Sequence, residues 1–198
     1  MSLRQALDQA TARLASAGIA DPRLDAELLA AHIWDVSPGR LRALIHTDPA
    51  DGDSPRLARL AAAVARRAER VPLQHITGRA PFRHLELEVG PGVFIPRPET
   101  EVTAELAIQA ARAFQGAAAG HLGGAAPGGR AGQVGGAEPV SAAGPVRVVD
   151  LGTGSGAIAA AVATEVPGAE VWAIESQPEA HSWAARNLAN LPVHLLLA

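Results

Sequence analysis

Residues 148–159 read VVDLGTGSGAIA, and this stretch decides the fold. Two valines lead to Asp150, three glycines follow at alternate positions, and an alanine-rich helical pattern then begins. A strand, a tight turn and a helix in this order form the first half of a βαβ unit. Glycine suits the turn because a Cβ disfavours positive φ and would keep a ligand away from the backbone. The stretch predicts a nucleotide-like cofactor site, with free N–H groups at the helix N-terminus aimed at the ligand.

The sequence after this turn continues the same alternation of strand and helix. An apolar run ends at Glu175, as a second strand would. Ser176 and Glu179 have the spacing of a capping box, with Pro178 in the first turn, and predict a helix to about residue 190. Residues 193–197 predict a third strand. We therefore expect a parallel sheet.

The sequence before the turn predicts two further parts. Residues 1–70 contain repeated helix-start signals, Ser2 with Gln5 and then three acid-proline or serine-proline pairs, and predict a helical bundle. Arg66, Arg67 and Arg70 are interpreted as a solvated face of its last helix. Residues 71–96 predict a β-hairpin linker, in which a strand at 85–89 is joined through Pro91-Gly92 to a strand at 93–95, with residues 73–76 leading in.

The last part, residues 97–198, is the predicted cofactor-binding domain. A helix should begin at Pro98, with Glu99 and Glu101 in its first turn, and continue through Ile108. Residues 115–145 are dominated by glycine, alanine and proline, and predict a flexible surface insert. The predicted fold class is thus α/β, with a helical bundle, a hairpin linker and part of a Rossmann-like sheet.

Composition narrows the class of protein. Hydrophobic residues make up 48% of the 198 residues, which is typical of a globular chain. The net charge of -3 disfavours a partner held mainly by phosphate contacts. There is no cysteine, no signal-peptide pattern and no apolar run long enough to span a membrane. These features suit a cytoplasmic protein with no direct contact to nucleic acid or membrane.

The glycine turn alone fits two cofactors. Gly152, Gly154 and Ala157 satisfy the relaxed dinucleotide pattern G-x-G-x-x-A. The pattern D-x-G-x-G-x-G, from Asp150 to Gly156, is that of the S-adenosylmethionine turn in class I methyltransferases. Glu175 fits either cofactor, because a carboxylate can accept hydrogen bonds from both ribose hydroxyls. Asp150 favours S-adenosylmethionine, since an acid suits its cationic methionine end and would repel a pyrophosphate. A dehydrogenase and an unliganded turn remain alternatives.

A longer set of motifs resembles the release factor glutamine methyltransferases, the HemK/PrmC family. Residues 72–78 read PLQHITG, residues 93–101 read VFIPRPETE and residues 150–158 read DLGTGSGAI. The family shows P-x-Q-Y-I-x-G, I-P-R-P-E-T-E and D-L-G-T-G-S-G-A-I in the same order. The resemblance covers the chain apart from residues 115–145. His75 stands where tyrosine is usual, and Glu175 where aspartate is more common.

The resemblance implies transfer of the methyl group of S-adenosylmethionine to the side-chain amide nitrogen of a glutamine. The family's substrate is the Gly-Gly-Gln loop of peptide chain release factors, and the helical bundle is its docking module. Arg97 to Thr100 would lie beside the cofactor pocket, and Glu175 would hold the ribose. The methionine part would be held by the residues of the turn, which are Gly152, Thr153, Gly154, Ser155 and Gly156.

One family motif is absent from these 198 residues. The N-P-P-Y motif, whose asparagine and backbone carbonyl hold the target amide in the family, does not occur. We therefore assign no catalytic residue and no metal ligand, and interpret the chain as a truncated, monomeric family member that would be poorly stable alone. The alternative is a non-catalytic fragment that binds a release factor or the ribosome. A nucleic-acid adenine methyltransferase is a third hypothesis, which the acidic charge balance disfavours.

Overall fold

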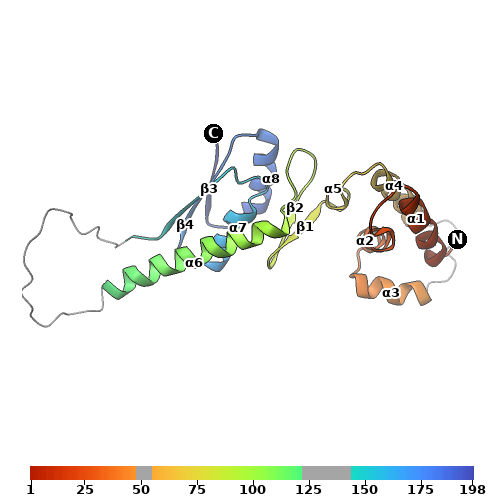
Figure 1. The fold of residues 1–198 in the computed structure, drawn as a ribbon, viewed down its shortest axis with the longest axis horizontal. Coiled ribbons are helices and arrows are strands. Elements are labelled where there is room, and N and C mark those ends of the chain that lie inside the picture. Colours follow the sequence, from red (N-terminus) through yellow and green to blue (C-terminus); the bar gives the residue numbers. More distant parts are fainter. Residues whose placement is uncertain (48–54, 122–143) are drawn as a thin grey trace, which may run out of the picture. The chain divides into compact units, whose positions relative to one another are not determined.

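The computed structural model describes residues 1–47, 55–121 and 144–198. The chain forms two compact units, Met1–Arg79 and Ala80–Ala198. The boundary between them lies inside the segment 71–96 that the sequence suggests as a linker. The predicted fold class is confirmed: helices come first, followed by a hairpin and a parallel α/β sheet (Figure 1).

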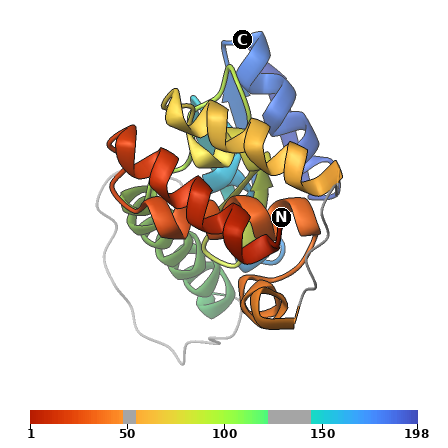
Figure 2. The same cartoon turned by 90° about the vertical axis from the view of Figure 1, so that its right-hand side faces the viewer.

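The first unit is built from helices that bury leucine-rich faces against one another. Ser2 and Gln5 form the predicted capping box, with the Gln5 N–H 3.2 Å from Ser2 Oγ and the Ser2 N–H 2.9 Å from Gln5 Oε1. Helices α1 and α4 lie side by side across α2, as the red and gold ribbons of Figure 2 show. The helices are α1 (Leu3–Ser16), α2 (Pro22–Trp34), α3 (Pro38–Thr47), α4 (Pro55–Ala68) and α5 (Leu73–Thr77).

The basic end of α4 is only partly a solvated face. Arg67 is 20% exposed, and its Nε lies 2.6 Å from a carboxylate oxygen of the buried Asp25 in α2. Arg67 also donates to the carbonyl oxygen of Val71. Arg70 donates to the carbonyl oxygen of Ala17. The interpretation of Arg67 as a solvated residue is therefore wrong, because its partner lies 42 residues away in the sequence.

The hairpin differs from the prediction. It pairs β1 (Arg79–Phe82) with β2 (Leu85–Glu88), and its turn contains Arg83 at a φ of 53°. The predicted strand at 93–95 is wrong: these residues belong to an irregular segment that joins β2 to α6. We call residues 89–97 the connecting segment. The predicted lead-in at 73–76 is the short helix α5.

The second unit continues with one long helix and a parallel sheet. Helix α6 (Pro98–His121) extends past residue 115, so the first seven residues of the predicted flexible insert are helical, and residues 122–143 lie outside the described residues. The strands β3 (Arg147–Leu151), β4 (Glu170–Glu175) and β5 (Val193–Leu197) pair in that order, all parallel. Helix α7 (Ala157–Glu165) follows β3, and α8 (Pro178–Leu188) follows β4. None of the described helices is both long and apolar enough to cross a membrane.

The strand pattern divides the sheet into two faces. Val171 and Ala173 are fully buried against the helices, in a core that includes Ile108 of α6 and Val162 of α7. On the opposite side of the pleat, Val149 is 56% exposed and Leu151 at the strand end is 73% exposed. Among the described strands β3 has a partner on one side only, which is β4.

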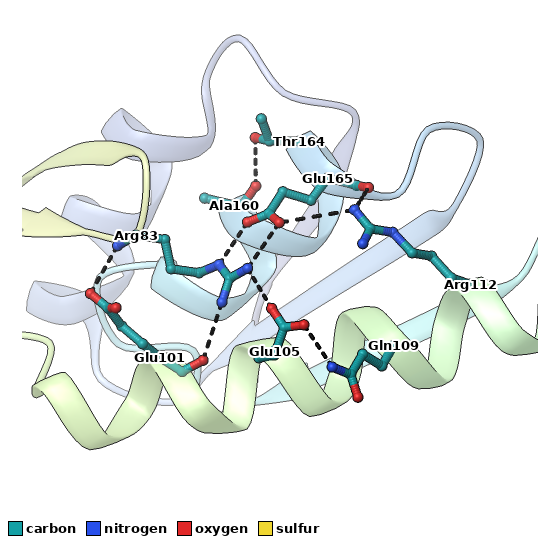
Figure 3. A network of polar contacts seen from close by, with 8 residues as sticks. All are labelled: Arg83, Glu101, Glu105, Gln109, Arg112, Ala160, Thr164 and Glu165. Carbon is teal, nitrogen blue, oxygen red and sulfur yellow. Dashed lines mark hydrogen bonds and ion pairs between the residues drawn. The ribbon is translucent and has the colours of Figure 1, made fainter.

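A cluster of charged residues around Arg83 joins the hairpin to α6 and α7 (Figure 3). The guanidinium donates to both carboxylate oxygens of Glu165, with Nε at 2.6 Å and Nη2 at 2.9 Å. Nη2 also lies 2.7 Å from Glu105, and the backbone N–H of Arg83 donates to Glu101. The hydrogen bonds from Arg83 lower the pKa of Glu165 and of Glu105, although burial opposes the shift. Arg83 therefore holds the hairpin turn against two helices.

Replacing Arg83 by glutamine should lower the melting temperature of the second unit by a few degrees near neutral pH. The control, Arg147→Gln at the exposed Arg147–Glu170 pair, should change it little. Because the Glu165 pKa lies below its ordinary value of 4.5, the Arg83 contribution is complete above that pH and is lost as the pH falls through the lowered pKa. Thermal melts by circular dichroism across this range check it; an Arg83 effect that persists unchanged in acid would contradict the assignment.

Candidate cofactor site

The glycine turn, residues 152–156, connects β3 to α7 and requires its glycines. Gly152, Gly154 and Gly156 all have positive φ, at 71°, 60° and 83°. A Cβ on Gly152 or Gly154 would meet no atom within 4 Å, so backbone conformation and open space for a ligand explain these two glycines. A Cβ on Gly156 would lie 3.0 Å from Leu188 Cγ, so this glycine also permits close packing of α8.

Most of the turn's N–H groups are already bonded. Gly152 and Thr153 both donate to the carbonyl oxygen of Ile174, at 2.8 and 3.0 Å. Gly154 donates to Glu175 Oε2 at 2.9 Å, and Gly156 donates to the carbonyl oxygen of Thr153. These four residues of the turn therefore do not offer free N–H groups to a ligand, and at the helix N-terminus the N–H of Ala159 is bonded to Asp150. The turn is instead tied to the end of β4.

Glu175 stands at the end of β4 and is 7% exposed. Its Oε1 accepts from the N–H groups of Ser176 and Gln177, at 2.8 and 2.9 Å, while Oε2 accepts from Gly154. Burial alone would raise the pKa of this carboxyl, but the three backbone donors outweigh burial and lower the pKa. Glu175 is thus held as a carboxylate, in a fixed orientation, beside the turn. The predicted capping box of Ser176 and Glu179 is wrong, because Gln177 is the N-cap residue of α8 and makes no side-chain cap bond.

Asp150 braces the turn from the side of β3. Its Oδ2 accepts from the hydroxyl of Thr153 at 2.7 Å and from the N–H of Ala159 at 3.2 Å. The carboxylate thereby links the strand end, the turn and the first turn of α7. Asp150 also lines the adjoining cavity, so its charge faces the space where a ligand would lie.

A cavity of about 500 Å³ lies between the glycine turn and the connecting segment. The carboxyl ends of β3 and β4 open into it, as expected for a ligand site on a parallel sheet. Of the predicted cofactor-binding residues, which are residues 152–156 and Glu175, all line the cavity except Gly156. Gly156 packs against Leu188 instead. Sequence reasoning missed several other lining residues, among them Gly92, Phe94, Ile95, Pro96, Gln177 and Ala180.

The cavity combines acidic and basic groups. Asp150 and Glu175 come from the ends of β3 and β4, and Arg97 and Thr100 from the connecting segment and the first turn of α6. Phe94 in the connecting segment lines the same cavity and is 90% exposed. In the sequence, an aromatic residue in a proline-rich stretch could have marked Phe94 as a candidate lining residue. Among the described residues, no group of three histidines or acids is placed to hold a metal ion.

The fold and the site define a class. A parallel α/β unit with a glycine turn after its first strand and a buried acid at the end of its second is the Rossmann-like arrangement of class I methyltransferases, here in part. Residues 5–78 match the model of the PrmC N-terminal domain. The chain belongs to the release factor glutamine methyltransferase family, as the motifs of the sequence predict.

Relatives with high identity cover nearly all of the chain. It is 47% identical over 188 residues to the release factor glutamine methyltransferase of Streptomyces coelicolor, which is 94% of this chain and 54% of the relative. The enzyme of that name from Mycolicibacterium smegmatis is 44% identical over 99% of this chain and 57% of its own length. That of Deinococcus radiodurans is 35% identical over 96% and 56%. The chain thus spans about half the length of the curated relatives it matches.

Alanine substitutions should separate the roles of the glycines. Gly154→Ala should cost about 1–2 kcal/mol of unfolding free energy, because only the positive φ opposes a Cβ there. Gly156→Ala should cost about 2–5 kcal/mol, because contact with Leu188 adds to the strain. Gly116→Ala, in α6 and in open space, is the control and should be neutral or stabilising. Urea unfolding measures all three; equal costs for Gly154 and Gly156 would refute the packing role of Gly156.

Proposed function

We propose that this chain binds S-adenosylmethionine in the cavity between the glycine turn and the connecting segment, and serves methyl transfer to the side-chain amide nitrogen of a glutamine. The observation that carries the proposal is the fixed Glu175 carboxylate beside a turn with open space above Gly152 and Gly154. The cavity of about 500 Å³ falls within the usual range for small-molecule sites.

The residues present fit the cofactor. Oε2 of Glu175 accepts one backbone N–H and keeps a lone pair for a ribose hydroxyl, since a carboxylate oxygen can accept two bonds. Asp150 supplies negative charge toward the cationic methionine end. Arg97 also lines the cavity, where a carboxylate of the ligand would find a partner. The proposed cofactor site uses residues of the second unit only.

S-adenosylmethionine supplies an activated methyl group on a sulfonium. The chain's own contribution is to bind and orient the cofactor, because its acids and turn are fixed by internal hydrogen bonds before any ligand enters. The similar proteins from Streptomyces coelicolor and Mycolicibacterium smegmatis are named release factor glutamine methyltransferases. We therefore propose peptide chain release factors as the protein substrate, the helical first unit as the docking module, and a monomeric, cytoplasmic protein with no direct role for nucleic acid.

A dinucleotide is less well suited to this cavity. The carboxylate of Asp150, which lines the cavity beside the glycine turn, would repel a pyrophosphate. The N–H groups of Gly152, Thr153 and Gly154 are engaged within the protein, so these three residues of the turn do not offer them to a phosphate. Both observations favour a ligand with hydroxyl and cationic groups.

Calorimetry with S-adenosylmethionine and with NADH tests the cofactor. The wild-type chain should bind S-adenosylmethionine, and Glu175→Gln should weaken binding at least about tenfold because an amide loses the charge and places a donor near Gly154. The matched control is Glu170→Gln on the same strand, outside the cavity, which should bind within about twofold of wild type. Binding of NADH instead, or equal affinity for both variants and wild type, would exclude the assignment.

Transfer of a labelled methyl group tests the reaction separately. A release factor that carries the Gly-Gly-Gln loop is compared with a variant in which the glutamine is replaced by alanine, and with duplex DNA. Label on the intact loop alone supports the proposed reaction. Cofactor binding without transfer favours the non-catalytic alternative for this chain, and label on DNA favours an adenine methyltransferase.

A further inference from the structure

Asn187 in α8 connects two parts of the second unit that lie far apart in sequence. Its Oδ1 accepts from the N–H of Glu88 at 2.7 Å, and its Nδ2 donates to the carbonyl oxygen of Glu88 at 2.9 Å. The same Nδ2 donates to the carbonyl oxygen of Ser155 at 2.8 Å. The reversed amide would set NH₂ against an N–H and oxygen against two carbonyls, so this orientation is the only one that satisfies all three bonds.

The bonds to Glu88 fix the start of the connecting segment on α8. One turn earlier, the indole N–H of Trp183 donates to the carbonyl oxygen of Pro91 at 3.1 Å. A Cβ on Gly90 would lie 2.4 Å from the Trp183 ring, and one on Gly92 would lie 2.7 Å from Glu179 Cβ. The backbone between residues 88 and 92 therefore lies directly on the surface of α8.

The bond to Ser155 fixes the opposite side of the cavity on the same helix. Ser155 is 3% exposed and lines the cavity. The next residue, Gly156, packs against Leu188, which follows Asn187 in the chain. Trp183 and Asn187 are four residues apart and so share one face of α8. One helix thus holds the connecting segment and the glycine turn at a fixed separation. Asn187 bonds Ser155 in the turn and Glu88, the residue immediately before the connecting segment.

We propose that Asn187 is a positioning residue that sets the width of the cofactor cavity. It bonds the backbone of Ser155, which lines the cavity, and of Glu88, from which the connecting segment continues, while itself lying outside the set of lining residues. Holding both sides in place before the ligand arrives reduces the ordering cost of binding. The proposal rests on the proposed function in one respect, namely that this cavity holds the cofactor.

The wild-type chain gives a first test without any variant. Both side-chain amide protons of Asn187 bond to carbonyls, so they should exchange with solvent far more slowly than those of the exposed Asn190. Amide NMR of the unliganded full chain measures this. Equal exchange at Asn187 and Asn190 would overturn the proposal.

Asn187→Asp keeps the shape of the side chain and the acceptor for Glu88, but removes both donated bonds. In unliganded protein, hydrogen exchange should rise at residues 88–95 and 152–157 together, while amides of β4 stay protected. The affinity for S-adenosylmethionine should fall about tenfold. Asn190→Asp adds the same charge nearby and should change neither the hydrogen exchange nor the affinity for S-adenosylmethionine. Trp183→Phe removes the bond to Pro91 and part of the ring that packs on Gly90, and should raise exchange at residues 89–93 but not in the glycine turn.

The outcomes separate this inference from the proposed function. In Asn187→Asp, a rise in hydrogen exchange on one side of the cavity only, or an equal rise throughout the chain, would contradict a positioning role for Asn187. If wild-type protein fails to bind S-adenosylmethionine, the cofactor assignment fails, whereas the exchange measurements still decide whether Asn187 couples the two sides.

Discussion

The second unit depends on the contact between the glycine turn and the end of β4. Two N–H groups of the turn share the carbonyl oxygen of Ile174, and a third donates to the Glu175 carboxylate. This contact is possible because β3 and β4 are parallel neighbours, so their carboxyl ends meet at the same edge of the sheet. It fixes Glu175 in place, and Glu175 in turn orders the first residues leading into α8. The cavity, the acid that lines it and the helix that positions its two sides all follow from this one junction.

Three features of the fold could be predicted from the sequence, and the reasons are physical. Three glycines at alternate positions mean positive φ, and all three adopt it. A capping box at Ser2 and Gln5 depends only on residues within one helical turn, and it forms as expected. The parallel order of strands also follows from the alternation of strand and helix. The glycine and capping-box inferences use contacts between residues close in sequence, where residue type strongly favours one geometry, although the same capping-box spacing at Ser176 and Glu179 does not form a box.

The errors arise where distant contacts decide. Pro91-Gly92 suggests a hairpin turn, but the positive φ of Gly92 serves packing against Glu179, 87 positions later in the numbering. The true turn contains Arg83, which adopts positive φ without the usual glycine because its side chain is bound by Glu105 and Glu165. Arg67 finds Asp25, and Asn187 finds Glu88, only after folding. No spacing rule applied to a single sequence could reveal these partners. The length of α6 is different, because the high helix propensity of the alanines after residue 115 could have indicated a longer helix.

The internal bonding of the turn also bears on which ligand the cavity suits. A glycine turn before a helix is commonly an anion site because its N–H groups are free. Here a carboxylate of the protein itself, Glu175, occupies one of those donors, and Asp150 occupies the N–H of Ala159 in α7. What remains for a ligand is acceptor capacity on fixed carboxylates, which matches ribose hydroxyls and a cationic sulfonium or ammonium group rather than a pyrophosphate. The same glycine pattern can therefore serve opposite charges, and the residues that bond the turn from within determine which.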